Sequence, residues 1–175
     1  METREIRIAG WSSRGLRCPD CDIELANGNM SVHRVTLIQM PNGTGKTTTL
    51  NLLRAALSGS APDGGPWSEY AINDLAKEDS PSGKFVLRLL VDGKHFAITL
   101  EFDFSNSGEV ETYTTTPAGE EVGFMVPRAL EQFFNPNFVR FFVFDGELGD
   151  LVHPLLGNHH APLQCEVLDP GHLLV

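Results

Sequence analysis

Residues 40–48 read Met-Pro-Asn-Gly-Thr-Gly-Lys-Thr-Thr, and the fold and function predicted for the chain rest on this stretch. From Asn42 onward it matches the second half of a phosphate-binding loop, Asn-Gly-x-Gly-Lys-Thr. Glycine has no Cβ, so the backbone can turn sharply and direct several N–H groups at phosphate oxygens. The stretch therefore predicts a nucleotide site, with ATP and Mg²⁺ as the cofactors.

Each residue of this loop has an expected part in the site. Lys46 is expected to lie between the β- and γ-phosphates and to act in catalysis, and the Thr47 hydroxyl to ligate Mg²⁺. Met40 stands where the full pattern has glycine, and its side chain restricts the backbone at the mouth of the loop. The predicted nucleotide-binding residues of the loop are Asn42, Gly43, Thr44, Gly45, Lys46, Thr47 and Thr48.

The segments on either side of the loop fit the same motif. Residues 34–39, Arg-Val-Thr-Leu-Ile-Gln, are β-branched and apolar enough for a buried strand. Residues 47–57 have leucines on one helical face, and Gly59 follows as a stop signal. A strand, a glycine-rich turn and a helix together predict an α/β fold of the P-loop NTPase class.

The other segments predict antiparallel strands around this unit. Residues 5–9 and 22–26 are expected strands, and a turn at residues 27–29 would pair the second of them with the strand before the loop, giving a mixed sheet. Asp92-Gly93 is a type I′ turn signal between two alternating apolar strands, so residues 84–116 predict an antiparallel lobe of three strands. Two short helices are expected, at residues 68–77 and 127–134.

A second informative stretch lies near the C-terminus. Residues 138–144, Phe-Val-Arg-Phe-Phe-Val-Phe, are a near-continuous apolar run that predicts a strand buried on both faces. The next residues are Asp145-Gly146-Glu147, and a carboxylate at the end of a buried strand is the geometry of a Walker B aspartate. Asp145 would then bind the metal through water, and Glu147 would act in catalysis by polarising the attacking water. The alternative is an Asp-Gly turn that closes a core strand.

Length and charge narrow the possible classes. A chain of 175 residues suits one domain with a small added lobe. With 13 basic and 23 acidic residues, its net charge of −10 disfavours tight, non-specific DNA binding by this chain alone. The sequence contains neither an apolar stretch of membrane-spanning length nor a signal peptide, so a cytoplasmic protein without membrane contact is expected. Residues 152–175 lack periodicity and are expected to be an irregular, poorly ordered tail.

Three cysteines, Cys18, Cys21 and Cys165, make an odd count, so a disulfide framework is not expected. Cys18-Pro-Asp-Cys21 has the spacing of half a zinc site, but no second pair follows at the spacing of a zinc finger. Two reduced thiols near a turn are therefore favoured over a metal site.

Taken together, residues 5–151 resemble the N-terminal portion of SMC-like ABC ATPases of the SbcC and DndD type. The resemblance rests on the isoleucine-rich first strand with its Ser-Ser-Arg loop, on residues 41–48, on the antiparallel lobe, and on Phe-Phe-Val-Phe-Asp-Gly-Glu-Leu at residues 141–148. It implies an N-terminal lobe of an ATPase head over residues 1–151.

The resemblance also implies roles and partners. Arg14 would lie against the nucleotide, and Asp145 and Glu147 would approach Mg²⁺ from the Q-loop side. The signature helix, the Walker B strand and a catalytic glutamate would come from a second ATPase half or a homodimer partner, and DNA would be bound through that assembly. The chain alone is then expected to hydrolyse ATP slowly or not at all. Two alternatives remain open: a self-sufficient small P-loop NTPase with Asp145 as Walker B, and a non-catalytic interaction module.

Overall fold

The computed structural model describes residues 5–27, 31–32, 35–105 and 108–143. The chain divides into two units, Met1–Phe144 and Asp145–Val175. Every described residue belongs to the first unit, so the fold below is that of the first unit alone.

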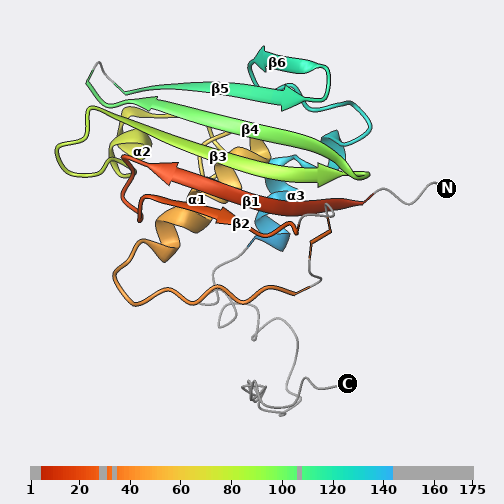
Figure 1. Cartoon of the computed structure of the whole chain (residues 1–175). Helices are drawn as coiled ribbons and strands as arrows, with labels where there is room; N and C mark the ends of the chain where they lie inside the picture. The colour runs from red at the N-terminus through yellow and green to blue at the C-terminus, as the bar shows by residue number, and fades with distance from the viewer. Residues whose placement is uncertain (1–4, 28–30, 33–34, 106–107, 144–175) are drawn as a thin grey trace, which may run out of the picture. The chain divides into compact units, whose positions relative to one another are not determined.

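The described residues form a single six-stranded sheet in the order β2-β1-β3-β4-β5-β6 (Figure 1). Each pair of neighbouring strands is antiparallel. The strands are β1 (Ile6–Arg14), β2 (Cys21–Glu24), β3 (Ser82–Val91), β4 (Lys94–Asp103), β5 (Glu109–Thr116) and β6 (Gly119–Val122).

Helices are few in the described residues, and Figure 1 shows them on one face of the sheet. They are α1 (Lys46–Ser58), α2 (Glu69–Asn73) and α3 (Pro136–Phe142), with a 3₁₀ turn at Glu131–Phe133. The predicted α/β P-loop NTPase fold with a mixed sheet is therefore wrong: the described chain is mostly β, with antiparallel pairing throughout. The expected helix at residues 127–134 is also wrong, since only the 3₁₀ turn forms there.

The hairpin of β3 and β4 confirms the strongest local signal in the sequence. Asp92 and Gly93 have φ angles of 50° and 73°, as a type I′ turn requires at both central positions. The two strands pair over their whole length, from Ser82 opposite Asp103 to Val91 opposite Lys94. The third strand expected after them is β5. Successive hairpins build this half of the sheet without any parallel crossover.

The main core lies between the sheet and α1. Alternate side chains of β3 and β4 point to one face of the sheet because side chains alternate along a strand. There they pack against Leu52, Ala55 and Ala56 of α1, and Trp67 meets the ring of Phe102 edge-on at 5.6 Å. The buried side chains of the two strands in this main core are Phe85, Leu87, Leu89, Phe96, Ile98, Leu100 and Phe102.

The strand expected just before the phosphate-loop motif is absent. Residues 35–39 belong to no strand, and Val35 and Leu37 are 87% and 91% exposed. The chain after β2 does not pair with this segment. Instead, Leu25 and Ala26 donate to the Ala9 carbonyl, and Val32 packs over Ala9 in a small second core. Across the predicted turn, only an isolated antiparallel bridge forms among the described residues, between Ala26 and Val32, and the hairpin does not continue into residues 35–39.

The strand expected at residues 138–144 is also wrong, because α3 covers most of that run. Asn135 caps this helix by accepting a hydrogen bond from the Phe138 N–H at 2.9 Å, and Pro136 occupies its first turn. Both are helix-start signals. The rings of Phe138 and Phe142, four residues apart, lie 4.4 Å from each other on one helical face. A short apolar run does not by itself distinguish a strand from a helix.

Helix α1 agrees closely with its prediction. It ends at Gly59, whose left-handed backbone (φ 64°) lets its N–H donate to the Ala55 carbonyl at 2.9 Å. Within α1, the Arg54 Nε donates to the Val143 carbonyl at 2.7 Å, and this bond ties α1 to the C-terminal end of α3. The helix expected at residues 68–77 is the shorter α2.

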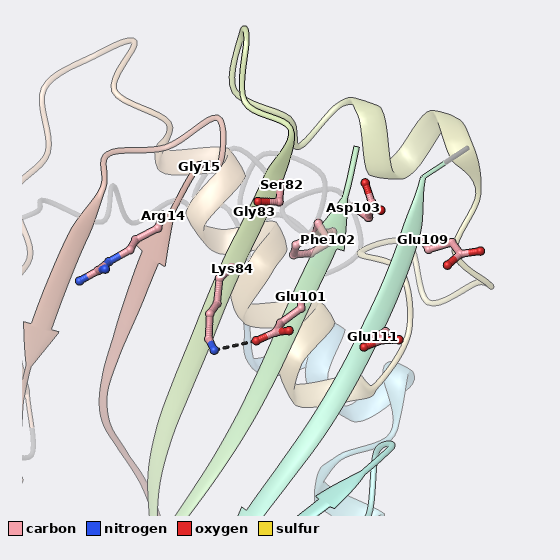
Figure 2. Close-up of a pocket in the computed structure, with 10 residues that line it drawn as sticks. All are labelled: Arg14, Gly15, Ser82, Gly83, Lys84, Glu101, Phe102, Asp103, Glu109 and Glu111. Atoms are coloured by element: carbon pink, nitrogen blue, oxygen red, sulfur yellow. Dashed lines mark hydrogen bonds and ion pairs between the residues drawn. The ribbon is translucent and has the colours of Figure 1, made fainter. Parts of the chain in front are cut away.

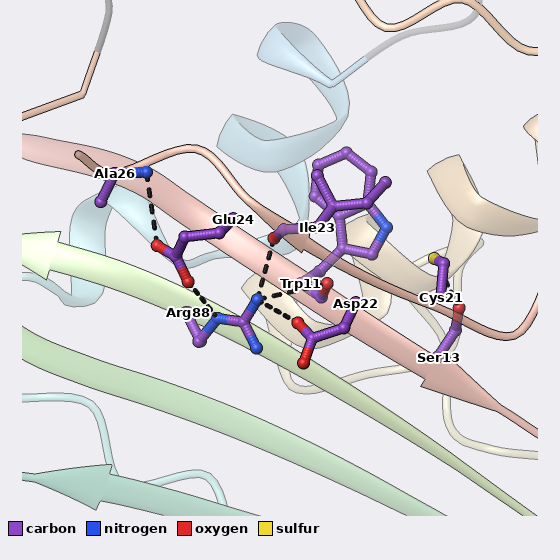
Figure 3. A network of polar contacts seen from close by, with 8 residues as sticks. All are labelled: Trp11, Ser13, Cys21, Asp22, Ile23, Glu24, Ala26 and Arg88. Carbon is purple, nitrogen blue, oxygen red and sulfur yellow. Dashed lines mark hydrogen bonds and ion pairs between the residues drawn. The ribbon is translucent and has the colours of Figure 1, made fainter. Parts of the chain in front are cut away.

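Arg88 on β3 holds the outer strand β2 to the sheet (Figure 3). Its Nη2 donates to Asp22 Oδ1 at 2.6 Å and to the Ile23 carbonyl at 2.8 Å, and its Nε lies 3.5 Å from Glu24 Oε2. The guanidinium reaches across β1 beside Gly10, where a Cβ would lie 2.2 Å from the Ile23 carbonyl oxygen. A larger residue at position 10 would therefore push β2 away.

We predict that Arg88→Ala destabilises the fold by about 1.5–3 kcal/mol, because hydrogen bonds to charged groups contribute on that order. Urea unfolding, followed by circular dichroism, measures the difference. Lys84→Ala is the matched control: its ion pair with Glu101 (2.7 Å) is half-exposed, so a loss below about 1 kcal/mol is expected. Equal losses in the two variants would contradict the role given to Arg88.

Candidate functional site

The phosphate-loop motif leads directly into the longest described helix. Lys46 is the first residue of α1, and Gly45 is its N-cap. Gly43 and Gly45 have φ angles of 77° and 81°, in the left-handed region that glycine adopts without strain. The two glycines thus supply the sharp turns for which the motif calls.

Lys46 folds back over the loop. Its Nζ donates to Asn42 Oδ1 at 2.7 Å, and lies 3.2 Å from the Met40 carbonyl oxygen and 3.4 Å from that of Pro41. The Thr44 hydroxyl also donates to the Pro41 carbonyl, at 2.7 Å. The positive charge is therefore held against the loop by exposed acceptors. Met40, the departure from the motif, takes part through its backbone carbonyl only.

The first turn of α1 is open to an anion. The first N–H groups of a helix have no intrahelical acceptor, and no side chain caps those of α1. Its first turn also carries no acidic residue to offset the positive end of the helix dipole. Thr47 is exposed and Thr48 half-exposed, whereas Thr49 is buried, with its hydroxyl donating to the Gly45 carbonyl at 3.0 Å.

The loop is seated on the segment after β1. A Cβ on Gly45 would lie 2.7 Å from both the Arg17 carbonyl oxygen and the Cys18 Cα, whereas one on Gly43 would meet no atom within 4 Å. Gly45 is therefore pressed against protein backbone, and Gly43 faces open space. Burial raises the pKa of the Cys18 thiol, while contacts with the side chains of Ser13 and Thr49 act in the opposite direction.

Arg14 is the one nucleotide-binding residue outside the loop that the resemblance implies. It lies exposed at the end of β1 and lines a different cavity of about 490 Å³, none of whose lining residues belongs to residues 40–48. Figure 2 shows this cavity over the ends of β3, β4 and β5. Its carboxylates, from Glu101, Asp103, Glu109 and Glu111, outnumber the two cations Arg14 and Lys84. Such a lining repels phosphate, so this cavity is not suited to bind the phosphates of a nucleotide.

The structure does not test the second predicted cluster, Asp145 and Glu147. Asp145 and Glu147 lie outside the described residues, so Thr47 is the only predicted metal ligand that is placed. In the described part of the chain, no three His, Cys, Asp or Glu side chains are grouped so as to hold a metal ion. Sequence reasoning missed Thr49 and Cys18 as neighbours of the loop, and no spacing signal could have revealed the contact between Cys18 and Gly45.

No protein-family model and no curated protein matches the chain. None of the helices in the described ranges is long and apolar enough to cross a membrane.

We predict that Gly45→Ala destabilises the protein more than Gly43→Ala. Both alanines would have to adopt a left-handed backbone, at a cost of about 1–2 kcal/mol. At position 45 the new methyl group would also collide with the Arg17 and Cys18 backbone, which adds about 1–3 kcal/mol. Thermal and urea unfolding of the two variants measure the difference. Equal stabilities would show that Gly45 is not seated on residues 17 and 18.

Proposed function

We propose that residues 40–48 bind the phosphates of ATP together with Mg²⁺. The observation that supports this most directly is the joint geometry of the loop: two left-handed glycines, a lysine folded over the turn, and an uncapped helix start. Each of these features alone is common. Together they combine a side-chain cation with free backbone N–H groups at one helix start, which is what a chain of phosphates requires.

The ligand would exchange for contacts that already exist. Lys46 Nζ would leave Asn42 Oδ1 and the two loop carbonyls for phosphate oxygens, a stronger pairing because both partners are charged. The N–H groups of the first turn of α1 would donate to the same phosphates. The exposed Thr47 hydroxyl would ligate Mg²⁺, and the open space beside Gly43 leaves room for the ligand.

Hydrolysis is a separate part of the proposal. The motif resemblance to SMC-like ATPases of the SbcC and DndD type suggests a cytoplasmic assembly that couples ATP hydrolysis to DNA repair or processing. In that assembly a second ATPase half, or a second copy of the chain, would complete the site and carry the contact with DNA. The chain alone would then turn over slowly, because the groups that stabilise the transition state would be incomplete.

A second candidate function is a non-catalytic interaction module. It is favoured by residues 35–39, which belong to no strand and leave Val35 and Leu37 almost fully exposed. Exposed apolar side chains in a row are typical of a surface that meets another protein. This function predicts no affinity for nucleotides.

Calorimetric titration of the full chain with Mg·ATP tests the phosphate site. Lys46→Ala is expected to weaken binding by about 10- to 100-fold, since a charge-assisted hydrogen bond contributes about 1.5–3 kcal/mol. Lys84→Ala is the matched control, because it removes the same charge at a distance from the loop and should leave the affinity unchanged. Chelating Mg²⁺ with EDTA should weaken binding of ATP to the unmodified chain.

Phosphate release measured on the same samples distinguishes an ATP-binding half from a self-sufficient NTPase. Binding that depends on Lys46, with little release, supports an ATP-binding half that needs a partner. Steady release that depends on Lys46 would favour a self-sufficient NTPase. The absence of ATP binding, or equal binding by the Lys46→Ala and Lys84→Ala variants, would refute the phosphate site.

A further inference from the structure

Two cysteines meet at one buried hydroxyl beneath the loop. Cys21 Sγ lies 3.2 Å from Ser13 Oγ, and the Cys18 thiol also contacts the Ser13 side chain. The Ser13 hydroxyl donates to the Pro19 carbonyl at 2.7 Å, which leaves its oxygen free to accept from the thiols. Figure 3 shows Ser13 and Cys21 facing each other across β1 and β2. Both thiols therefore lie beside the same hydroxyl.

The spacing of the two cysteines is compatible with a disulfide. Cys18 and Cys21 are three positions apart, and a chain that folds back over four residues brings its end Cα atoms within about 7 Å. A disulfide needs Cα atoms no further apart than that. The Ser13 hydroxyl binds the Pro19 carbonyl, and Ser13 is paired with Cys21 in the register of β1 and β2, so the short segment between the cysteines lies beside Ser13.

We propose that Cys18 and Cys21 form a reversible redox pair that closes into a disulfide on reaction with a small-molecule disulfide, and that this closure alters the loop of residues 40–48. The first part stands on the geometry of the thiols. The second part can be measured on the loop itself without ATP. Only its effect on ATP affinity rests on the proposed phosphate site.

The reaction is a thiol–disulfide exchange in two steps. The half-exposed Cys21 gives up its proton to solvent and attacks one sulfur of the small disulfide, forming a mixed disulfide and releasing one thiolate. Cys18, as thiolate, then attacks the Cys21 sulfur and expels the second small thiolate. Two protein thiols are oxidised, and one small disulfide is reduced to two thiols that take up the two protons. The buried Cys18 cannot be the first nucleophile, since a small disulfide does not reach it.

The route from the disulfide to the loop is a direct contact. The N-cap of α1, Gly45, is packed so tightly on Cys18 that an added Cβ would lie 2.7 Å from the Cys18 Cα and 2.9 Å from its Cβ. The Cys18 thiol also contacts Thr49 in the first turn of α1. Disulfide closure turns the sulfur from Thr49 toward Cys21 and shifts the Cys18 Cβ. Because no free space separates Cys18 from Gly45, the helix start must shift with it.

The chemical test uses the full chain carrying Cys165→Ser, so that the proposed pair supplies the only thiols. After incubation with oxidised glutathione, mass spectrometry is expected to show the loss of two hydrogens and no retained glutathione. Adding Cys18→Ser should leave glutathione attached to Cys21, because the resolving thiol is gone. Adding Cys21→Ser should leave Cys18 unmodified. Two free thiols after oxidation, or a stable adduct on the pair, would overturn the disulfide, provided that circular dichroism shows a folded chain.

The link to the loop is read by hydrogen–deuterium exchange, which does not depend on ATP. Peptides covering residues 40–49 are expected to exchange at least about threefold faster in the oxidised chain, with β4 peptides unchanged as an internal control. The same rate in both redox states would overturn the link.

Calorimetry with Mg·ATP then separates the two proposals. An affinity that differs between the oxidised and reduced chains, but not in Cys21→Ser, supports the redox pair as a regulator of the phosphate site. Equal affinities would overturn that regulation and leave the phosphate site standing. If neither state binds ATP, the phosphate site fails, while the masses and exchange rates still decide for or against the disulfide and its contact with the loop.

Discussion

Burial of the inner face of β3 and β4 is the constraint on which the described structure depends. These two strands present a continuous apolar surface, and α1 covers it with Leu52, Ala55 and Ala56. Fully burying one such leucine or phenylalanine contributes about 1.5–3 kcal/mol, so several of them outweigh any single polar contact in the molecule. Packing against the sheet, rather than the phosphate-loop motif, therefore places α1.

The candidate site follows from that placement. Once α1 is held by its buried face, its N-terminus lies where Gly45 meets the Arg17 carbonyl and Cys18. The loop before it is short and held by its own contacts, chiefly those of Lys46 and Thr44 with loop carbonyls. The contact between Gly45 and Cys18 also places the loop next to the two thiols, so the proposed phosphate site and the proposed redox pair adjoin each other. No acidic side chain would repel an anion at this place, since neither the loop nor the first turn of α1 carries a carboxylate.

The outer face of the sheet has a different character. Arg88 reaches across β1 to the carboxylates of β2, and Lys84 pairs with Glu101. Beyond this pair the face becomes acidic toward β5, where Glu111 accepts a hydrogen bond from the Tyr113 hydroxyl and raises the pKa of Tyr113 to about 12.

The sequence by itself determined the elements whose information is local. Asp92-Gly93 specified a hairpin because both turn positions need positive φ, and Gly59 ended α1 for the same reason at one position. The glycines and Lys46 of the loop were likewise readable, because their geometry depends on neighbours within a few residues. The wrong predictions share one cause: residues 34–39 and 138–144 are apolar runs whose state depends on whether a partner strand exists to receive their hydrogen bonds.

Only the tertiary structure decided that residues 35–39 form no strand and that most of the second run forms α3, which is tied to α1 by Arg54. It also decided that Arg14 lies at another cavity and that Cys18 supports Gly45. These are contacts between residues distant in sequence, so no spacing encodes them. Local backbone preferences could be predicted from the sequence. The pairing of strands and the packing of the loop depended on which surfaces came into contact in the folded chain.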